Sequence, residues 1–221
     1  MSRESSKPRV GLLALSLELY ETLAPDLRSQ REAWLRANVL PALASIADVR
    51  FDRAVFRRED IDAAVRDFQD DQIEAILVVC LTYSPSLMTL PALRQTGLPI
   101  VIWNTQELFS VDAGLKGPDL SANHGVHGTQ DLGNVLLRSG VYFEYVTSHL
   151  RDSNALERLS DVLTAAAAVS RLRRARIGLM GHPFPGMGDL GLDTTHMSAT
   201  LGCEWLNLSV AELNRRAVAV M

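Results

Sequence analysis

The feature that most constrains the fold is the run EAILVVCL at residues 74–81, which is apolar at almost every position. A strand that alternates apolar and polar residues has one face in water, whereas an uninterrupted apolar strand is covered on both faces. Strands of this kind belong to parallel sheets, because the crossover helices of such sheets lie on both faces. The run therefore predicts a central, fully buried strand of an α/β sheet.

Strand-like and helical segments alternate along the chain on either side of this run. We expect strands at 10–15, 48–51, 74–81, 98–104 and 141–147, and helices at 22–46, 59–70, 87–96, 132–140 and 152–174. Five such alternations predict a doubly wound (Rossmann- or flavodoxin-like) parallel α/β sheet with helices on both faces.

Two stretches of the chain begin alike, KPRVGLLAL at 7–15 and RRARIGLMG at 173–181. In each, a basic lead precedes a short apolar run, V/I-G-L, that is typical of a buried strand. We therefore expect a disordered tail at 1–8, an N-terminal α/β domain at 9–172 and the beginning of a second, incomplete α/β domain at 173–221. The alternative is that the last segment packs back on the first domain as an extension of it.

Composition excludes several classes of protein. The net charge of -4 argues against a nucleic-acid binder, and Arg171, Arg173 and Arg174 fall at a helix end, where cations favour the helix dipole. Cys80 and Cys203 show no metal-type spacing, which favours a reducing compartment. The N-terminus lacks the apolar core of a signal peptide, and no apolar run approaches the roughly 18 residues that cross a bilayer. We expect a cytoplasmic protein with no nucleic-acid or membrane partner.

Ligands of open α/β sheets bind outside the carboxyl ends of the strands. The chain offers five loops at such positions, namely 16–21, 82–86, 104–109, 123–131 and 181–193. The first lacks the glycines of a GxGxxG turn, so no dinucleotide cofactor is expected, and Glu18 in it can equally be an acid at a helix N-terminus. In the second loop Tyr83 suits a polar ligand, while Ser84 and Ser86 fit helix N-caps better than nucleophiles.

The fourth loop, NHGVHGTQD, is the most polar and places His124 three residues before His127. Its glycines favour a loop or a helix N-terminus with a close backbone approach. A metal site is weakly indicated because no carboxylate or third ligand adjoins the two histidines, and hydrogen bonds to a substrate fit better.

The last loop, GHPFPGMGDLGLD, lacks the GK[ST] ending of a phosphate-binding P-loop. Its mixed side chains are typical of the wall of a small-molecule pocket: His182, Phe184, Met187 and Asp189. No pair of carboxylates in the chain has the pattern of an acid/base dyad.

Five motifs, in order, resemble the N-terminal half of the L-arabinose/L-fucose isomerase-like family: VGLLALSLELYE, LTYSPS, LPIVIWNTQ, NHGVHGTQDLGNVLLRSG and RIGLMGHPFPGMGD. The resemblance runs from about residue 9 to residue 213. It implies an aldose–ketose isomerase that moves a proton between C1 and C2 of a sugar with the help of Mn²⁺ or a similar divalent ion. It also implies a homo-oligomer with sites formed between subunits, and metal ligands in the half that this sequence lacks.

The same resemblance implies which residues contact the substrate: Glu18, Leu19, Tyr20, Tyr83, His124, His127 and Met187. The sequence departs from the family pattern at two glutamine positions. The first-loop glutamine reads Leu17 or is displaced to Glu18, and the glutamine of the His-Gly loop reads His124. These departures leave the identity of the sugar open.

Two hypotheses for the function follow. In the first, the chain is the N-terminal portion of a sugar isomerase-like protein, supplies substrate and oligomer contacts, and is catalytically silent by itself. In the second, it is a non-catalytic sugar-binding or subunit-interaction module. A third reading is a flavodoxin-like domain or a periplasmic-type receptor domain. The missing signal peptide argues against the receptor.

Overall fold

The computed structural model describes residues 7–181, 184–187 and 191–220, so most of the predicted tail at 1–8 lies outside the described residues. The chain divides into two compact units, 1–167 and 168–221, which we call unit 1 and unit 2. The sequence analysis placed a domain boundary after residue 172. That the second domain is incomplete stays a prediction.

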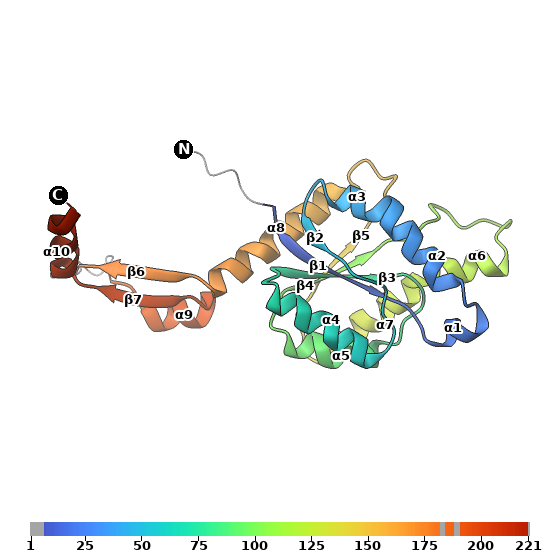
Figure 1. Cartoon of the computed structure of the whole chain (residues 1–221), viewed down its shortest axis with the longest axis horizontal. Coiled ribbons are helices and arrows are strands. Elements are labelled where there is room, and N and C mark those ends of the chain that lie inside the picture. Colours follow the sequence, from blue (N-terminus) through green and yellow to red (C-terminus); the bar gives the residue numbers. More distant parts are fainter. Residues whose placement is uncertain (1–6, 182–183, 188–190, 221) are drawn as a thin grey trace. The chain divides into compact units, whose positions relative to one another are not determined.

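Unit 1 is built on a five-stranded sheet of strand order β2-β1-β3-β4-β5 (Figure 1). Every neighbouring pair of strands is parallel. This strand order is the flavodoxin-like form of the doubly wound sheet, and it confirms the predicted fold class. The strands are β1 (Arg9–Leu15), β2 (Asp48–Arg50), β3 (Ala75–Cys80), β4 (Ile100–Asn104) and β5 (Glu144–Thr147).

Helices cover both faces of this sheet (Figure 1). On one face, Leu12 and Trp103 pack with Leu35 and Leu163 in a single core cluster. On the other face, Leu13 packs in a second cluster that includes residues of α4, α5 and α7. The helical elements are α1 (Leu19–Leu23), α2 (Leu27–Trp34), the π-helical turn η1 (Leu35–Val39), α3 (Leu40–Leu43), α4 (Arg58–Asp70), α5 (Ser86–Gln95), α6 (Gly117–Ala122), α7 (Gly125–Arg138) and α8 (Ala155–Arg173).

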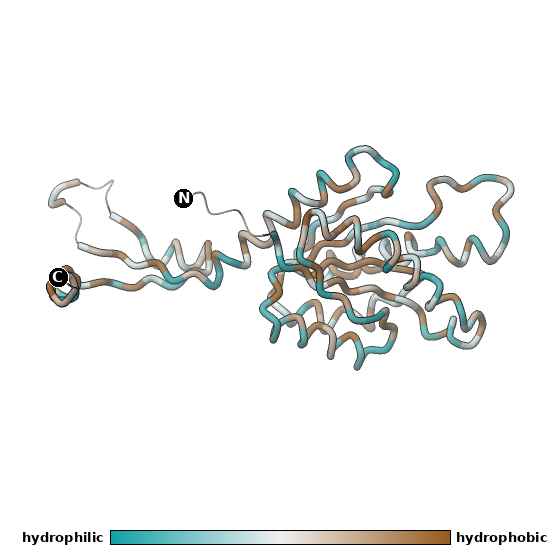
Figure 2. Tube along the Cα trace, turned by 45° about the horizontal axis from the view of Figure 1, so that its top comes forward, coloured by the Kyte–Doolittle hydropathy of each residue, from teal (hydrophilic) through white to brown (hydrophobic). Residues whose placement is uncertain are grey.

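Strand β3 is buried at every position, as the uninterrupted apolar run predicted. Figure 2 shows the apolar residues gathered along the strands of unit 1 and the polar ones along the outer helices and loops. None of the described helices is both long and apolar enough to span a membrane.

The prediction of one continuous helix at 22–46 is wrong. The segment 24–26 separates α1 from α2, and η1 interrupts the path from α2 to α3. Pro41 lies at the start of α3 and has no N–H to donate back along the helix. The wider π turn just before it accommodates this loss and the bulk of the ring. Helix α6 was not predicted, and α7 begins at Gly125, well before the predicted start at residue 132.

Unit 2 contains a two-stranded parallel sheet of β6 (Arg176–Met180) and β7 (Glu204–Leu208). Its helices are α9 (Thr194–Leu201) and α10 (Val210–Val220). The Asp193 carboxylate accepts the N–H of His196 and caps α9, which ends at Gly202 with a left-handed φ of 75°. Residues of β6 alternate between exposed and half-buried, so this strand lacks the two-sided cover of β3.

Candidate functional site

Strands β1 and β3 end side by side, and polar groups close the sheet edge between them. The hydroxyl oxygens of Ser16 and Thr82 are 3.2 Å apart, and both residues are fully buried. The Thr82 hydroxyl donates to the carbonyl oxygen of Tyr83 at 2.9 Å. In the order 2-1-3-4-5 this edge is the topological switch point, where doubly wound sheets bind ligands.

The N-terminus of α7 presses directly onto the carboxyl end of β3. A Cβ on Gly125 would lie 2.1 Å from the carbonyl oxygen of Cys80, and one on Gly128 would lie 2.8 Å from the backbone nitrogen of Ser84. Only glycine fits at such distances. The structure confirms that the His-Gly segment is a helix N-terminus with a close backbone approach, and this contact brings His124 to the sheet edge.

A side chain of α7 also caps the N-terminus of the neighbouring helix α5. The Asp131 carboxylate on α7 accepts the N–H of Ser86, the first residue of α5, at 3.1 Å. No side chain of the N-cap itself makes this bond, because the N-cap position is Pro85. The prediction that Ser84 or Ser86 caps this helix is therefore wrong. Burial raises the pKa of the Cys80 thiol to about 12, so this thiol stays protonated and unreactive near neutral pH.

Four of the predicted site residues lie together as an aromatic cluster: Tyr20, Tyr83, His124 and His127. The Tyr20 hydroxyl is 3.5 Å from Nδ1 of His124. The ring centroid of His124 lies 6.0 Å from that of Tyr83 and 4.3 Å from that of His127. Burial lowers the pKa of His124 from its ordinary value, and the neighbouring His127 lowers it further. Burial also raises the pKa of Tyr20, so both groups favour their neutral forms.

The other predicted site residues are placed differently. Glu18 pairs with Arg57 at 2.9 Å on an exposed surface, and Leu19 on α1 is 55% exposed. Met187 belongs to unit 2 and is 48% exposed. His182 and Asp189, predicted to line a pocket wall with Met187, lie outside the described residues.

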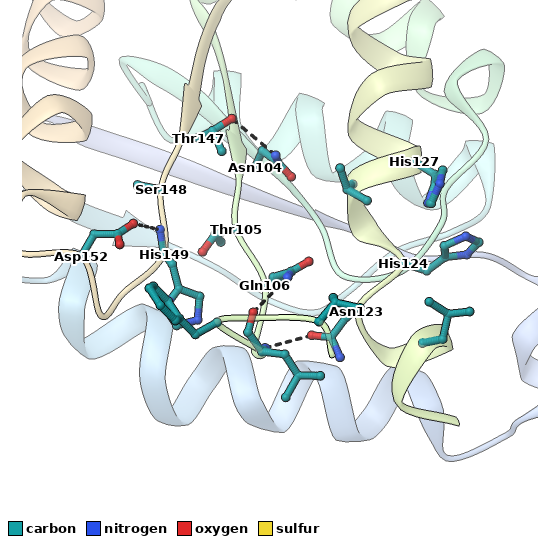
Figure 3. A pocket seen from close by; sticks show the side chains of 15 residues that line it. Asn104, Thr105, Gln106, Asn123, His124, His127, Thr147, Ser148, His149 and Asp152 are labelled. Atoms are coloured by element: carbon teal, nitrogen blue, oxygen red, sulfur yellow. Dashed lines mark hydrogen bonds between the residues drawn. The ribbon is translucent and has the colours of Figure 1, made fainter. Parts of the chain in front are cut away.

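A cavity of about 550 Å³ opens at the carboxyl ends of β4 and β5 (Figure 3). Figure 3 shows His124 and His127 on one side of it, His149 and Asp152 on the other, and Asn104 and Thr105 between them. Tyr20 and Tyr83 contact His124 but do not line the cavity themselves. The lining residues are Asn104, Thr105, Gln106, Leu108, Phe109, Val111, Leu120, Asn123, His124, Val126, His127, Thr147, Ser148, His149 and Asp152.

Internal hydrogen bonds hold the loop that follows β4 in place. The buried Asn123 amide accepts the N–H of Leu108 at 2.9 Å and donates to the carbonyl oxygen of Asp119 at 2.8 Å. Arg31 on α2 forms an ion pair with Glu107 in the same loop. The cavity wall is thus built before any ligand arrives, which reduces the entropy lost on binding.

Backbone contacts fix the tautomer of His149. Its Nδ1 accepts the N–H of Arg151 at 3.1 Å, so Nε2 carries the proton and donates to the carbonyl oxygen of Glu107, also at 3.1 Å. The Asp152 carboxylate accepts the backbone N–H of His149 at 2.7 Å. These bonds make His149 a fixed part of the wall.

The cavity offers neutral hydrogen-bonding groups in the main. Among the described residues that line it, none is Lys or Arg, and Asp152 supplies the sole carboxylate. The described part of the chain has no group of three or more His, Cys, Asp or Glu side chains placed to hold a metal ion. The adjacent rings of His124 and His127 are also a poor donor set for Mn²⁺, which prefers oxygen ligands, and Asp152 lies on the other side of the cavity. The residues present therefore do not fit the ion that the resemblance implies.

Part of this chain is similar to L-arabinose isomerases. It is 30% identical over 127 residues to the L-arabinose isomerase of Aeromonas hydrophila, a match that covers 56% of this chain and 25% of that protein. Identity is 27% to the L-arabinose isomerases of Tolumonas auensis and Aeromonas salmonicida, with the same coverage. No family model matches the chain. The matches establish a distant relationship to L-arabinose isomerase and span about a quarter of the length of these relatives.

Sequence reasoning missed the second wall of the cavity. The loop at 104–109 was recognised by its position, but the segment after β5, which carries His149 and Asp152, was not among the five candidate loops. The signal was present, because polar residues follow directly on the predicted strand at 141–147. The rule that ligands bind at the carboxyl ends of parallel strands covers this segment too.

Proposed function

We propose that unit 1 is the sugar-binding module of an arabinose isomerase-like protein and binds a small neutral sugar at the carboxyl edge of its sheet. The observation that carries the proposal is the cavity itself, which has His124 and His127 on its wall and no cationic side chain among its described lining. Neutral amide, hydroxyl and imidazole groups both donate and accept hydrogen bonds, and this is what the hydroxyl groups of a sugar require. The distant similarity to L-arabinose isomerases supports the same ligand class.

The proposal assigns the isomerisation chemistry to residues that this chain does not contain. Aldose–ketose isomerisation needs a group that takes a proton from one carbon and returns it to the next. The one carboxylate of the described lining, Asp152, already accepts the N–H of His149. In this proposal Mn²⁺ and its ligands belong to another part of the assembly, a homo-oligomer in which unit 1 supplies sugar contacts. Residues 1–221 are then inactive as an isolated chain.

The cavity also supports a second candidate, a sugar-binding module with no catalytic partner. Its support is that the wall is already hydrogen-bonded through Asn123 and His149, so the cavity needs no further chain to form. The two candidates share the same ligand and differ only in turnover by the assembled protein.

The test is calorimetric titration of the 221-residue chain with L-arabinose, followed by an isomerisation assay with added Mn²⁺. We expect saturable binding without turnover. Replacing His124 with Ala should weaken binding about tenfold, the loss of roughly one hydrogen bond with its desolvation cost. Leu137→Ala, on an exposed position of α7 outside the cavity, is the matched control and should bind like the parent.

Three results would count against the proposal. Absence of sugar binding would remove it altogether, and unchanged binding by the His124 variant would move the site elsewhere. Turnover by this chain would refute the assignment of catalysis to other residues. The sedimentation coefficient in the same buffer measures the proposed homo-oligomer.

A further inference from the structure

The cavity lining includes a hydroxyl group without an internal partner. Thr105 is only 6% exposed, and its Oγ1 has no hydrogen-bond partner among the described residues. A buried, unpaired hydroxyl lowers stability unless a ligand or water satisfies it. The Gln106 amide next to it uses its N–H on the carbonyl oxygen of Leu108, which leaves its own oxygen available to accept.

The same lining includes exposed apolar side chains. Phe109, Val111 and Leu120 line the cavity and are 56%, 63% and 54% exposed. The ring of Phe109 stands edge-on to the imidazole of His149, with centroids 5.1 Å apart and an interplanar angle of 72°. This contact gives Phe109 a fixed neighbour, because backbone contacts hold His149, and more than half of the Phe109 side chain stays open to a ligand.

The cavity exceeds the needs of a free pentose. A cavity of about 550 Å³ falls in the range of roughly 300–1,000 Å³ that holds drug-sized ligands. A single pentose would satisfy the polar lining groups and leave the exposed apolar side chains to water. The absence of Lys and Arg from the described lining residues disfavours a sugar phosphate.

We propose that the cavity binds a neutral two-ring ligand, with a sugar ring hydrogen-bonded to polar groups such as Thr105 and Gln106 and a second ring stacked on Phe109. This inference rests on the proposed function and narrows its ligand class. The second ring is either an aryl aglycone or another sugar, because both present a flat face of C–H or π character to an aromatic side chain. Binding is the property at issue, since a glycoside with a blocked anomeric carbon has no aldehyde to isomerise.

A second copy of this chain is the other possible occupant of an exposed apolar rim. Two observations favour the small ligand. First, the apolar residues line the same cavity as the unpaired Thr105 hydroxyl. Second, a protein surface docked on the rim would leave that hydroxyl without a hydrogen-bond partner. The second copy is an outcome of the experiment below.

The experiment measures the affinity of the full chain for four compounds: L-arabinose, p-nitrophenyl α-L-arabinopyranoside, a disaccharide of L-arabinose, and p-nitrophenol. We expect the glycoside or the disaccharide to bind about fivefold more tightly than L-arabinose, the contribution of one aromatic stack. F109A should abolish this preference, so that the glycoside and L-arabinose bind equally tightly. F109L, which keeps most of the volume without a flat ring, should do the same if F109A does not fold.

The control is Tyr142→Ala, which removes an exposed aromatic side chain outside the cavity and should keep the preference. Equal binding of all three sugars, with no effect of F109A, would overturn the two-ring ligand and leave the proposed function standing. Binding of p-nitrophenol as tight as that of the glycoside would overturn the two-ring ligand, because the sugar ring would then contribute nothing, and no sugar binding at all would overturn both proposals. A dimer in sedimentation velocity that F109A dissociates, with no preference for the glycoside, would assign the rim to a second copy.

Discussion

The first strands of the two units have similar sequences, but they differ in how deeply they are buried. In unit 1, β1 reads RVGLLAL and is buried from its second residue to its last. In unit 2, β6 reads RIGLM and alternates between exposed and half-buried residues. Both form strands of parallel sheets. A local sequence pattern is therefore enough to set the strand, whereas the number of neighbouring strands and helices sets how far it is buried.

Cover on both faces explains the difference. Strand β1 has a hydrogen-bonded neighbour on each edge, β2 and β3, and helices on both faces. Strand β6 pairs with β7, and Leu208 of β7 remains 46% exposed. The apolar residues of the sheet in unit 2 are therefore only partly buried.

Hydrogen exchange should show the largest contrast between the units. Amides of β3 are expected to exchange only when unit 1 unfolds, while those of β6 exchange through local opening of a partly covered sheet. A protection ratio of at least about a thousandfold follows if the two openings differ by roughly 4 kcal/mol or more. Mass spectrometry of the peptides at 74–81 and 175–181 measures it. Equal protection would show that unit 2 is as well covered as unit 1.

A matched pair of glycine substitutions gives the next largest effect. A Cβ on Gly11 would lie 2.6 Å from the ring of the buried Phe68, whereas one on Gly178 would lie 2.6 Å from Cδ1 of Leu208. We expect Gly11→Ala to lower the free energy of unfolding by about 1–3 kcal/mol, because the ring cannot move away in a packed core. Gly178→Ala should change stability by less than about 0.5 kcal/mol, because the Leu208 side chain can rotate into solvent.

Urea unfolding followed by the fluorescence of the buried Trp103, in proteins that also carry Trp34→Phe and Trp205→Phe, measures the change in unit 1. Exchange of the β6 amides measures the change in unit 2. Equal losses in the two variants would mean that Leu208 is as tightly packed as Phe68. That result would remove the contrast drawn between the two strands.

The pKa of His124 in the aromatic cluster gives the smallest expected effect. It tests whether the burial in unit 1 extends to the carboxyl edge of its sheet. Burial and His127 lower the pKa of His124 from its ordinary value of 6.5. The unfolded chain therefore binds more protons than the folded one as the pH falls below about 6.5. The contribution of His124 to stability is present above that pH and is lost as the pH falls through the folded pKa.

Replacing His127 with Gln should raise the pKa of His124 towards, but not to, its ordinary value, because the repulsion is removed and the burial remains. Two-dimensional NMR of the imidazole resonances follows this titration. Gln130→Ala, at an exposed position of the same helix, should leave it unchanged. A fall in the pKa of His124, or no change, would show that the two rings do not interact as charges.

Much of unit 1 could be predicted because its patterns are local. The uninterrupted run of β3 and the alternation of elements predicted the doubly wound sheet. The rule for carboxyl edges pointed to the loops that carry Tyr20, Tyr83, His124 and His127. The break near Pro25, the π turn before Pro41 and the early start of α7 at Gly125 were not predicted. The first two lie at prolines, whose local effect the helical periodicity of 22–46 concealed, and the start of α7 depends on its packing against Cys80.

By itself, the sequence determined the strands of the sheet in unit 1 and most of its helices, and it placed the candidate site at one edge of a parallel sheet. Periodicity and chain order are enough for both, because parallel strands bring their carboxyl ends to a common side. Only the tertiary structure decided that α7 lies against Cys80, that His149 and Asp152 form the second wall of the cavity, and that β1 is buried while β6 is not. These features depend on residues far apart in the chain, whose contacts no local pattern encodes.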